Sequence, residues 1–535
     1  MKTRAVICIS TMMLLLVPFA HSASDPAGSV IPAIDPSYKA PTITVPEGFV
    51  VELVAGPPLV HHPIMAGFDD EGRLFVSETV GLNLNNKDLD KQTPNHVTLL
   101  EDEDGDGVFD KSTMFADKMT FPQGGLWHEG ALYVCSPPGL WRLEDTDGDG
   151  KADKRDQIAT GFAYTGNAAD VHGPFLHPNG RLYWCHGRKG HEVYQNDGKT
   201  LVSKNKGARI WSCKPDGSDV QVHAGGGMDN PTELTITPEG DILGSVNLFY
   251  GRPRGDVLVH WLYGGAYPRH DQAAVVAEFP RTGELLKEVV NFGHVAVSGL
   301  TRYQSDAFGE EYRDNVFVTF FNTHKLTRTI LMREGSSFSS RTEEFFHADS
   351  DDFHCTDVLE DADGSLLVID TGGWFRIGCP TSQIAKPELH GGIYRIRKKD
   401  AKPVRDPRGR GIDWENSPAG GIATLLDDPR FAVRDRAMRD LASRGDEATL
   451  DALGDTLRGD SAAARRNAIW VAARIGGEEA STLARRGLTD KDADVRQSAC
   501  HAAAVLNDRG SVSALMTIVR RDEPRVQREA AVTLG

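Results

Sequence analysis

The chain has 535 residues, with 59 lysines and arginines against 76 aspartates and glutamates, and a formal net charge of −17. This length exceeds one ordinary hydrophobic core, so it predicts two or more domains. The negative charge gives no net attraction to phosphate and argues against a nucleic-acid partner, whereas solvated acidic surfaces and divalent-cation sites both fit it.

The N-terminus has the pattern of a secretory signal. Lys2 and Arg4 precede an apolar stretch over residues 5–20, and Ala20-His21-Ser22-Ala23 offers small residues for cleavage. We expect a signal peptide over 1–23, a linker over 24–40 and a periplasmic or secreted protein. The alternative is an uncleaved N-terminal anchor.

Seven cysteines occur in the chain, and none of them forms a CxxC pair. Without CxxCH we expect no covalent haem in this chain. Export permits disulfides, but spacing does not reveal pairing, so we interpret most of these cysteines as small buried thiols.

Residues 41–399 have an all-β texture. An apolar stretch, a polar turn with glycine and an alternating strand recur, at spacings typical of propeller blades with variable loops. The pattern predicts a six-bladed β-propeller, with a β-sandwich or two small β domains as the alternative. The copies lie at 64–78, 125–136, 175–187, 234–247, 300–322 and 358–372.

Residues 400–420 are rich in proline, glycine and arginine and are expected to form a linker. From residue 421 to 535 a 31-residue repeat aligns Ala437, Ala468, Ala499 and Ala530. This spacing predicts an all-α, HEAT-like solenoid of helix pairs. We interpret Arg434, Arg465 and Arg496 as structural. Because the last copy ends after its first helix, we expect the sequence to be a fragment of a longer protein.

Two acidic loops 43 residues apart indicate calcium. Carboxylates at positions 1, 3, 5 and 9 with glycine at position 6 match the first part of a calcium-binding loop, but the flanks resemble strands. We expect structural Ca²⁺ sites, with solvated acidic turns as the alternative. The candidate ligands are Asp102, Asp104, Asp106 and Asp110 in the first loop, and Asp145, Asp147, Asp149, Asp153 and Asp156 in the second.

Polar residues at corresponding blade positions would meet at one central mouth of a propeller. His172 is the candidate general base, with Asp170 orienting it. Such convergence of carboxylates, amides and a histidine is typical of a binding site, although rim loops without a common site are the alternative. The candidate substrate- or cofactor-binding residues are Asp229, Asn230, Asn322, Trp374 and Arg376.

The LEDTDGDGKAD loop, the GGMDNPTE turn, DTGGWFRIGCPTSQ and GGIYRIRK together resemble the exported PVC-type "membrane-bound dehydrogenase domain" proteins. That group is distantly similar to quinoprotein glucose and sorbosone dehydrogenases. The resemblance implies that His172 abstracts a hydroxyl proton, and that pyrroloquinoline quinone is held near Asp229-Asn230-Pro231. In those dehydrogenases an arginine stands at the position of Asp229, so we expect this aspartate to repel an anionic quinone.

The favoured function is therefore a propeller dehydrogenase for a sugar or other polyol, which passes electrons to a cytochrome c domain or protein. One alternative is a non-catalytic scaffold that binds a glycan or protein, with a protein partner on the HEAT surface. Another is a calcium-dependent, lactonase-like hydrolase in which Asp229 and Asn230 bind a central metal.

Overall fold

A computed structural model of the chain describes residues 34–166, 170–269, 273–375 and 385–535. The expected signal peptide lies outside these residues, as do most of the expected N-terminal linker, Arg376 and the cysteines at 8 and 379. No helix among the described residues combines the length and apolarity needed to cross a membrane.

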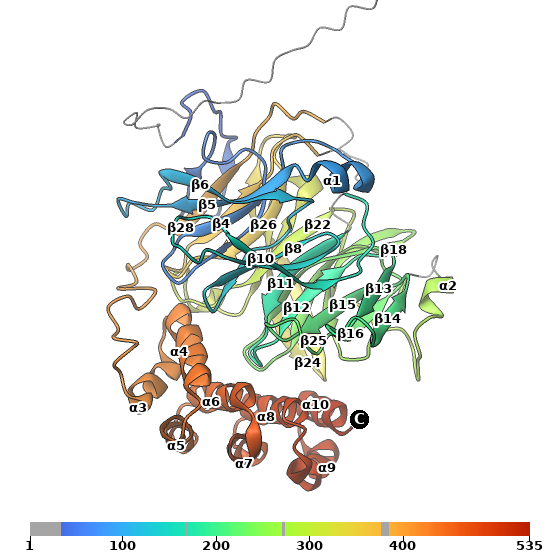
Figure 1. The fold of residues 1–535 in the computed structure, drawn as a ribbon, viewed down its shortest axis with the longest axis vertical. Helices are drawn as coiled ribbons and strands as arrows, with labels where there is room; N and C mark the ends of the chain where they lie inside the picture. The colour runs from blue at the N-terminus through green and yellow to red at the C-terminus, as the bar shows by residue number, and fades with distance from the viewer. Residues whose placement is uncertain (1–33, 167–169, 270–272, 376–384) are drawn as a thin grey trace, which may run out of the picture. The chain divides into compact units, whose positions relative to one another are not determined.

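Six antiparallel sheets form the blades of a propeller within the described residues (Figure 1). The first strands of consecutive blades contact one another in order, and the first strand of the last blade contacts that of the first. This closed ring confirms the predicted six-bladed propeller and excludes a sandwich. The first strands are β3 (Pro63–Phe68), β7 (Leu126–His128), β11 (Val171–Leu176), β17 (Asn230–Ile236), β22 (Val297–Arg302) and β26 (Cys355–Glu360).

Each blade continues outward through its later strands. In the first three blades these are β4 (Leu74–Glu78), β5 (Asn95–Glu101) and β6 (Lys111–Met119), then β8 (Ala131–Ser136), β9 (Gly139–Glu144) and β10 (Lys154–Thr160), then β12 (Leu182–His186), β15 (Ala208–Cys213) and β16 (Gln221–Gly226). In the last three they are β18 (Ile242–Gly251), β19 (Arg254–Trp261) and β21 (Val290–Gly293), then β23 (Val316–Phe320), β24 (Lys325–Glu334) and β25 (Ser337–Ala348), then β27 (Leu366–Asp370), β28 (Gly392–Lys398) and β2 (Phe49–Ala55).

Smaller strands and helices accompany the six blades. They are β1 (Ile43–Thr44) beside β25, the hairpin β13 (His191–Tyr194) and β14 (Leu201–Asn205), β20 (Ala266–Tyr267) beside β16, and the helices α1 (Asn86–Gln92) and α2 (Ala273–Val276).

The N-terminal strand β2 closes the propeller. It pairs antiparallel with β28 and becomes the outermost strand of the last blade, from Phe49 opposite Lys398 to Ala55 opposite Ile393. The last blade therefore combines both ends of the propeller sequence, and unfolding one end would expose the edge of β28.

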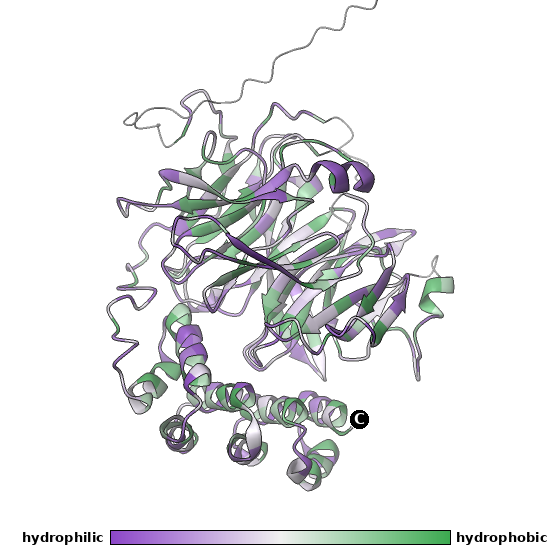
Figure 2. Cartoon of the chain, in the orientation of Figure 1, coloured by the Kyte–Doolittle hydropathy of each residue, from purple (hydrophilic) through white to green (hydrophobic). Residues whose placement is uncertain are grey.

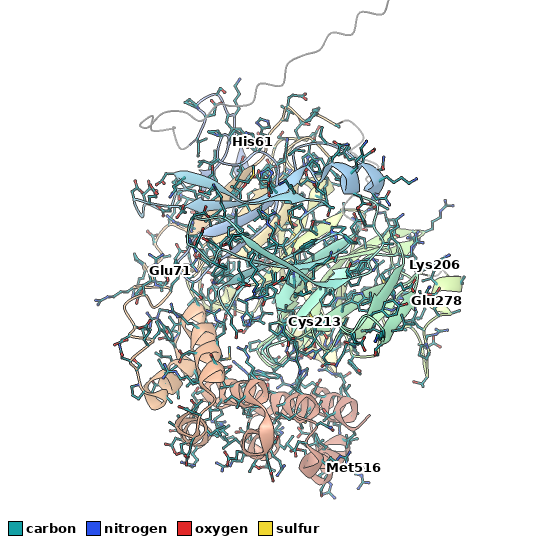
Figure 3. The ribbon with its side chains drawn as sticks, viewed as in Figure 1. His61, Glu71, Lys206, Cys213, Glu278 and Met516 are labelled. Atoms are coloured by element: carbon teal, nitrogen blue, oxygen red, sulfur yellow. The ribbon has the colours of Figure 1, made fainter. Side chains whose placement is uncertain are left out.

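Apolar side chains fill the space between the blades, and Figure 2 shows green strand segments throughout the propeller. The inner ring is tightly packed, since a Cβ atom on Gly67 of β3 would lie 1.4 Å from the carbonyl oxygen of Gly125. The five described cysteines are buried and free, as expected for structural thiols. One of them, Cys213, is labelled in Figure 3.

After the propeller, helices pair into a solenoid with HEAT repeats, and the 31-residue alignment is confirmed. The aligned Ala437, Ala468, Ala499 and Ala530 are at most 1% exposed, which allows close helix packing. The helices are α3 (Ala419–Ala423), α4 (Phe431–Arg444), α5 (Glu447–Thr456), α6 (Ala462–Ile475), α7 (Gly477–Arg486), α8 (Ala493–Val505), α9 (Val512–Arg521) and α10 (Pro524–Leu534).

The repeated arginines stabilise neighbouring repeats. Arg465 donates to both carboxylate oxygens of Asp490, at 2.7 and 2.9 Å, and Arg496 makes the equivalent pair with Asp522 at 2.7 Å. Arg434 donates to the carbonyl oxygens of Asp428 and Pro429 instead. These bonds agree with a structural role for the arginines.

The first helices of the repeats contact the propeller directly. Trp470 of α6 donates to the carbonyl oxygen of Pro238 at 2.9 Å, and Arg474 donates to that of Pro178 at 2.8 Å. Farther along, Arg528 of α10 forms an ion pair with Asp241. These bonds join α6 and α10 to the β11–β12 and β17–β18 turns of the propeller.

Candidate functional site

A cavity of about 290 Å³ lies where the first strands of the propeller begin. Every blade contributes, through its first strand or the segment that enters it, so the cavity occupies the central mouth that the sequence predicts. One lining residue from each blade, in chain order, is Met65, Gln123, His172, Thr232, Ser298 and Thr356.

His172 lines this cavity from β11 and is only 5% exposed. Its backbone pairs with Cys185, and the register with β12 shifts between His172 and Phe175. Such an irregularity at a sheet end redirects side chains, as is common beside binding sites.

Asp170 is fully buried just before β11. Its carboxylate accepts hydrogen bonds from the backbone N–H groups of Thr165, at 2.6 Å, and Gly166, at 2.8 Å. The carboxylate therefore fixes the loop that leads into the histidine strand, and it is absent from the cavity lining.

Asp229 and Asn230 line the same cavity. Asp229 lies between two arginines, with Arg188 Nε 2.9 Å from one carboxylate oxygen and Arg269 Nη1 3.2 Å from the other. The expectation that Asp229 repels an anion therefore needs correction, because two adjacent guanidinium groups outweigh its single negative charge.

The cavity carries positive charge in an acidic protein. Arg188, Lys189 and Arg254 line it, and Arg254 is partly neutralised because its Nε lies 3.4 Å from the buried carboxylate of Asp256. Of the two lining acids, Asp229 is paired with arginines, and burial beside Asp357 raises the pKa of Glu233 well above its usual value. The lining is consequently suited to a ligand that carries carboxylate or other anionic groups.

Aromatic rings form another part of the lining. Trp374 is 3% exposed and donates from Nε1 to the Thr371 hydroxyl at 2.7 Å. Its ring lies 5.2 Å from that of Phe375 and 6.2 Å from that of Phe121. These rings exclude water and offer flat apolar surface to a ring-shaped ligand.

The structure brings together four of the six described candidates for this site. Asn322 belongs to the short turn after β23, where its neighbour Phe321 lines the cavity. Arg376 lies outside the described residues. Sequence reasoning missed Arg188, Lys189 and Arg254, because nothing in their local sequence separates them from ordinary surface cations.

The first acidic loop joins β5 to β6, and its carboxylates gather at the first, third and fifth positions. Oxygens of Asp102, Asp104 and Asp106 lie within 4.8 Å of one another. Asp102 also accepts hydrogen bonds from the backbone N–H groups of Gly105, at 2.8 Å, and Gly107, at 2.9 Å. The loop is thus folded by its own carboxylates.

The second loop joins β9 to β10 and gathers Asp145, Asp147 and Asp149 in the same way. The remaining candidates do not join either group. Asp153 accepts a hydrogen bond from the N–H of Thr146, and Asp110 accepts one from the N–H of Glu103, so each of these carboxylates closes its own loop. Asp156 lies on β10, with its carboxylate 3.7 Å from Lys154 Nζ. Three carboxylates in each loop could hold Ca²⁺.

Fold and site together define a six-bladed propeller with one polar, cationic mouth, followed by HEAT repeats. The chain belongs to the family described as domain of unknown function DUF7133, which matches residues 35–400. HEAT repeats match residues 421–504. No curated protein matches the chain.

Several solved structures are similar to about two thirds of the chain. A Thermus thermophilus protein assigned as an oxidoreductase (glucose dehydrogenase) is 17% identical, with a TM-score of 0.45, over 65% of this chain and 99% of its own. A Trichoderma reesei enzyme of Carbohydrate-Active Enzymes family AA12 is 13% identical, with a TM-score of 0.45, over 68% and 98%. A protein assigned as a gluconolactonase is 12% identical, with a TM-score of 0.38, over 68% and 96%. At these identities the likeness concerns the fold alone.

Proposed function

We propose that the central cavity oxidises a hydroxyl group of a sugar or other polyol, with His172 as the general base. The observation that carries this proposal is the position of His172 in a cavity to which all six blades contribute, with polar groups from five of them. A neutral imidazole can accept the hydroxyl proton as the carbon is oxidised, and histidine titrates near neutral pH.

The lining fits the anionic quinone that the family resemblance implies. Arg188 and Lys189 would pair with its carboxylates, and Trp374 with Phe375 would cover its ring face. When bound, pyrroloquinoline quinone supplies the two-electron oxidant. Asp229 holds Arg188 in place through its 2.9 Å contact instead of opposing the cofactor.

The remaining lining groups position the substrate. Gln123 and Asn230 offer amide groups for hydrogen bonds to hydroxyls, and Phe121 and Phe321 keep water from the reacting atoms. His172 takes the proton from the oxygen that is oxidised. The arrangement requires no metal in the mouth, and the Ca²⁺ of the acidic loops would serve stability alone.

The hydrolase alternative is disfavoured by the same contacts. Both oxygens of Asp229 face arginines, so this carboxylate is poorly placed to coordinate a central cation.

The proposal extends to location and partners. Oxidation in the periplasm, after export through the signal peptide, would need an acceptor for the electrons, and a cytochrome c domain or protein meets this need. The first helices of the HEAT repeats contact the propeller, so we propose the second-helix face for a protein partner. Met516 of α9, 42% exposed and labelled in Figure 3, lies on that helix.

Dye reduction by the purified chain, loaded with pyrroloquinoline quinone and Ca²⁺, tests the proposal with a panel of sugars and polyols. We expect substrate-dependent reduction that His172→Gln lowers by about 100-fold or more, as for other general bases. His61→Gln, at an exposed histidine, is the matched control and should leave the rate unchanged. Quinone binding without any substrate-dependent reduction would contradict the proposal.

A further inference from the structure

Two carboxyl groups meet at the inner side of the cavity. Glu233 of β17 lines the cavity, and Asp357 of β26 lies against it from two blades away; they are 6% and 2% exposed. Gly299 of β22 lies between them, where a Cβ atom would come within 2.5 Å of Asp357 Cα and 2.9 Å of Glu233 Oε2. Glycine at this position is what allows the two acids to meet.

Backbone N–H groups from neighbouring strands hold both acids. Leu300 donates to Glu233 Oε2 at 2.9 Å, and Ala66 of β3 donates to Asp357 Oδ2 at 3.0 Å. The N–H of Val358 donates to Asp357 Oδ1 at 2.7 Å. The two acids also act on each other, since burial and then the neighbouring Asp357 raise the pKa of Glu233.

Two buried carboxyl groups on either side of one glycine repel each other when both are ionised, so a proton on one of them is favoured. The groups that face the pair favour this state. Among the described residues neither acid forms an ion pair, and Arg254, which lines the same cavity, lies 3.4 Å from Asp256 instead. The other titratable neighbour is the buried thiol of Cys185 on β12. Burial raises the pKa of Asp357 to about 6 and that of Glu233 well above its usual value.

Two buried carboxyl groups carry a desolvation cost wherever they lie in a protein. An apolar plug would close the channel without the desolvation cost of two carboxyl groups, so a role in the cavity explains the pair better than packing does.

We propose that Glu233 and Asp357 share one proton and form a second acid–base group of the cavity, beside His172. One proton would pass between a carboxyl oxygen of Glu233 and a hydroxyl or water in the cavity, with no change in electron count. The shared proton stands independently of the reaction, whereas its catalytic use rests on the proposed function.

Thermal unfolding of the full chain tests the shared proton without any activity. A carboxyl whose pKa is raised in the folded state binds more protons there than in the unfolded state, so stability falls as pH rises through about 6. Glu233→Gln removes this penalty while it keeps the shape. We expect a Tm about 2 °C above wild type at pH 8 and no gain at pH 5.

Asp357→Asn is the second variant and should shift the Tm in the same pH-dependent direction. Infrared spectra of the wild type at neutral pH should contain a buried protonated-carboxyl band that both variants weaken. A pH-independent Tm difference together with no such band would overturn the shared proton. If Ca²⁺ raised the Tm of the wild type and neither variant showed this rise, the pair would instead be a cation site.

The catalytic part has a separate readout. If the pair exchanges protons with the cavity, Glu233→Gln should shift the pH profile of kcat while quinone affinity stays within about twofold. An unchanged pH profile in an active enzyme would overturn this part alone. An inactive wild type that still shows the infrared band would refute the proposed function and leave the shared proton standing.

Discussion

Arg188 and Asp229 form an ion pair at the rim of the central cavity, with Nε 2.9 Å from Oδ1. Because Arg269 faces the other oxygen of Asp229, the rim carries more positive than negative charge. This charge balance favours anionic ligands in the cavity, and Asp229 should be interpreted together with its two arginine partners.

Charge removal at the rim should weaken binding of an anionic ligand. We expect Arg188→Gln to reduce the affinity for pyrroloquinoline quinone by about tenfold, since a charge-assisted bond contributes about 1.5–3 kcal/mol. Titration calorimetry at two salt concentrations measures this effect. Arg341→Gln, at a site whose side chain is 71% exposed and whose nearest carboxylate is 3.8 Å away, should change nothing. Equal affinities for all three proteins would contradict a cationic rim.

The bond between the solenoid and the propeller should be costly to break. Asp241 and Arg528 form an ion pair whose side chains are 2% and 13% exposed. Loss of Arg528 leaves the buried carboxylate with Arg333 and His260 as neighbours but without one charge-assisted bond, so Arg528→Ala should destabilise the protein by about 1.5–3 kcal/mol. Urea unfolding at pH 7 measures this, with Arg458→Ala at an exposed pair as the control.

The stability that Arg528→Ala loses should depend on pH in a definite direction. Neighbouring His260 and Arg528 hold the pKa of Asp241 well below its usual value. Its contribution to stability is therefore present above about pH 4 and lost as pH falls further, so wild type and Arg528→Ala should converge in acid. A loss that grows as the pH falls would argue against the ionic account.

Because β2 closes the ring, a substitution in its core should destabilise the protein strongly although it lies far from the cavity. Phe49 is 6% exposed and its ring lies 4.9 Å from that of Phe308 and 5.0 Å from that of Phe345. We expect Phe49→Ala to cost about 3–5 kcal/mol, because it leaves a cavity between β2 and the fifth blade. Denaturant unfolding checks this, and a loss below about 1 kcal/mol would mean that β2 is dispensable.

Calcium should stabilise the protein through the acidic loops. We expect the Tm to rise with Ca²⁺ and fall with chelator, and Asp102→Asn combined with Asp145→Asn to remove this difference. Asp156→Asn is the control, because its carboxylate lies outside the gathered group. A response to Ca²⁺ that survives the double substitution would place the ion elsewhere.

Much of the fold could be predicted from the sequence, because its repeats are local. Each of the six predicted copies overlaps the first two strands of a blade, and Leu74, Leu182 and Leu366 begin the second strands. The alanine register of the solenoid follows equally from helical periodicity. Closure by β2 was not predictable in this way, since its pairing with β28 joins residues more than 300 positions apart.

The site was predictable only in part. His172 and Asn230 lie at corresponding blade positions, and the fold brings them to one cavity. The partners of Asp229 could not be predicted, because Arg188 and Arg269 come from loops of different blades and their pairing depends on tertiary structure. The charge of Asp229, considered without its partners, therefore led to the wrong sign for the net charge of the rim.

The most direct test of the central claim is a single-turnover measurement on the quinone-loaded protein. Sugar is added without any electron acceptor, and the absorbance of the bound quinone is followed. The account predicts reduction of one quinone per chain in the wild type, slowed by about 100-fold or more in His172→Gln at unchanged quinone affinity. Reduction at equal rates in both proteins, or stoichiometric quinone binding with no reduction by any sugar or polyol, would contradict it.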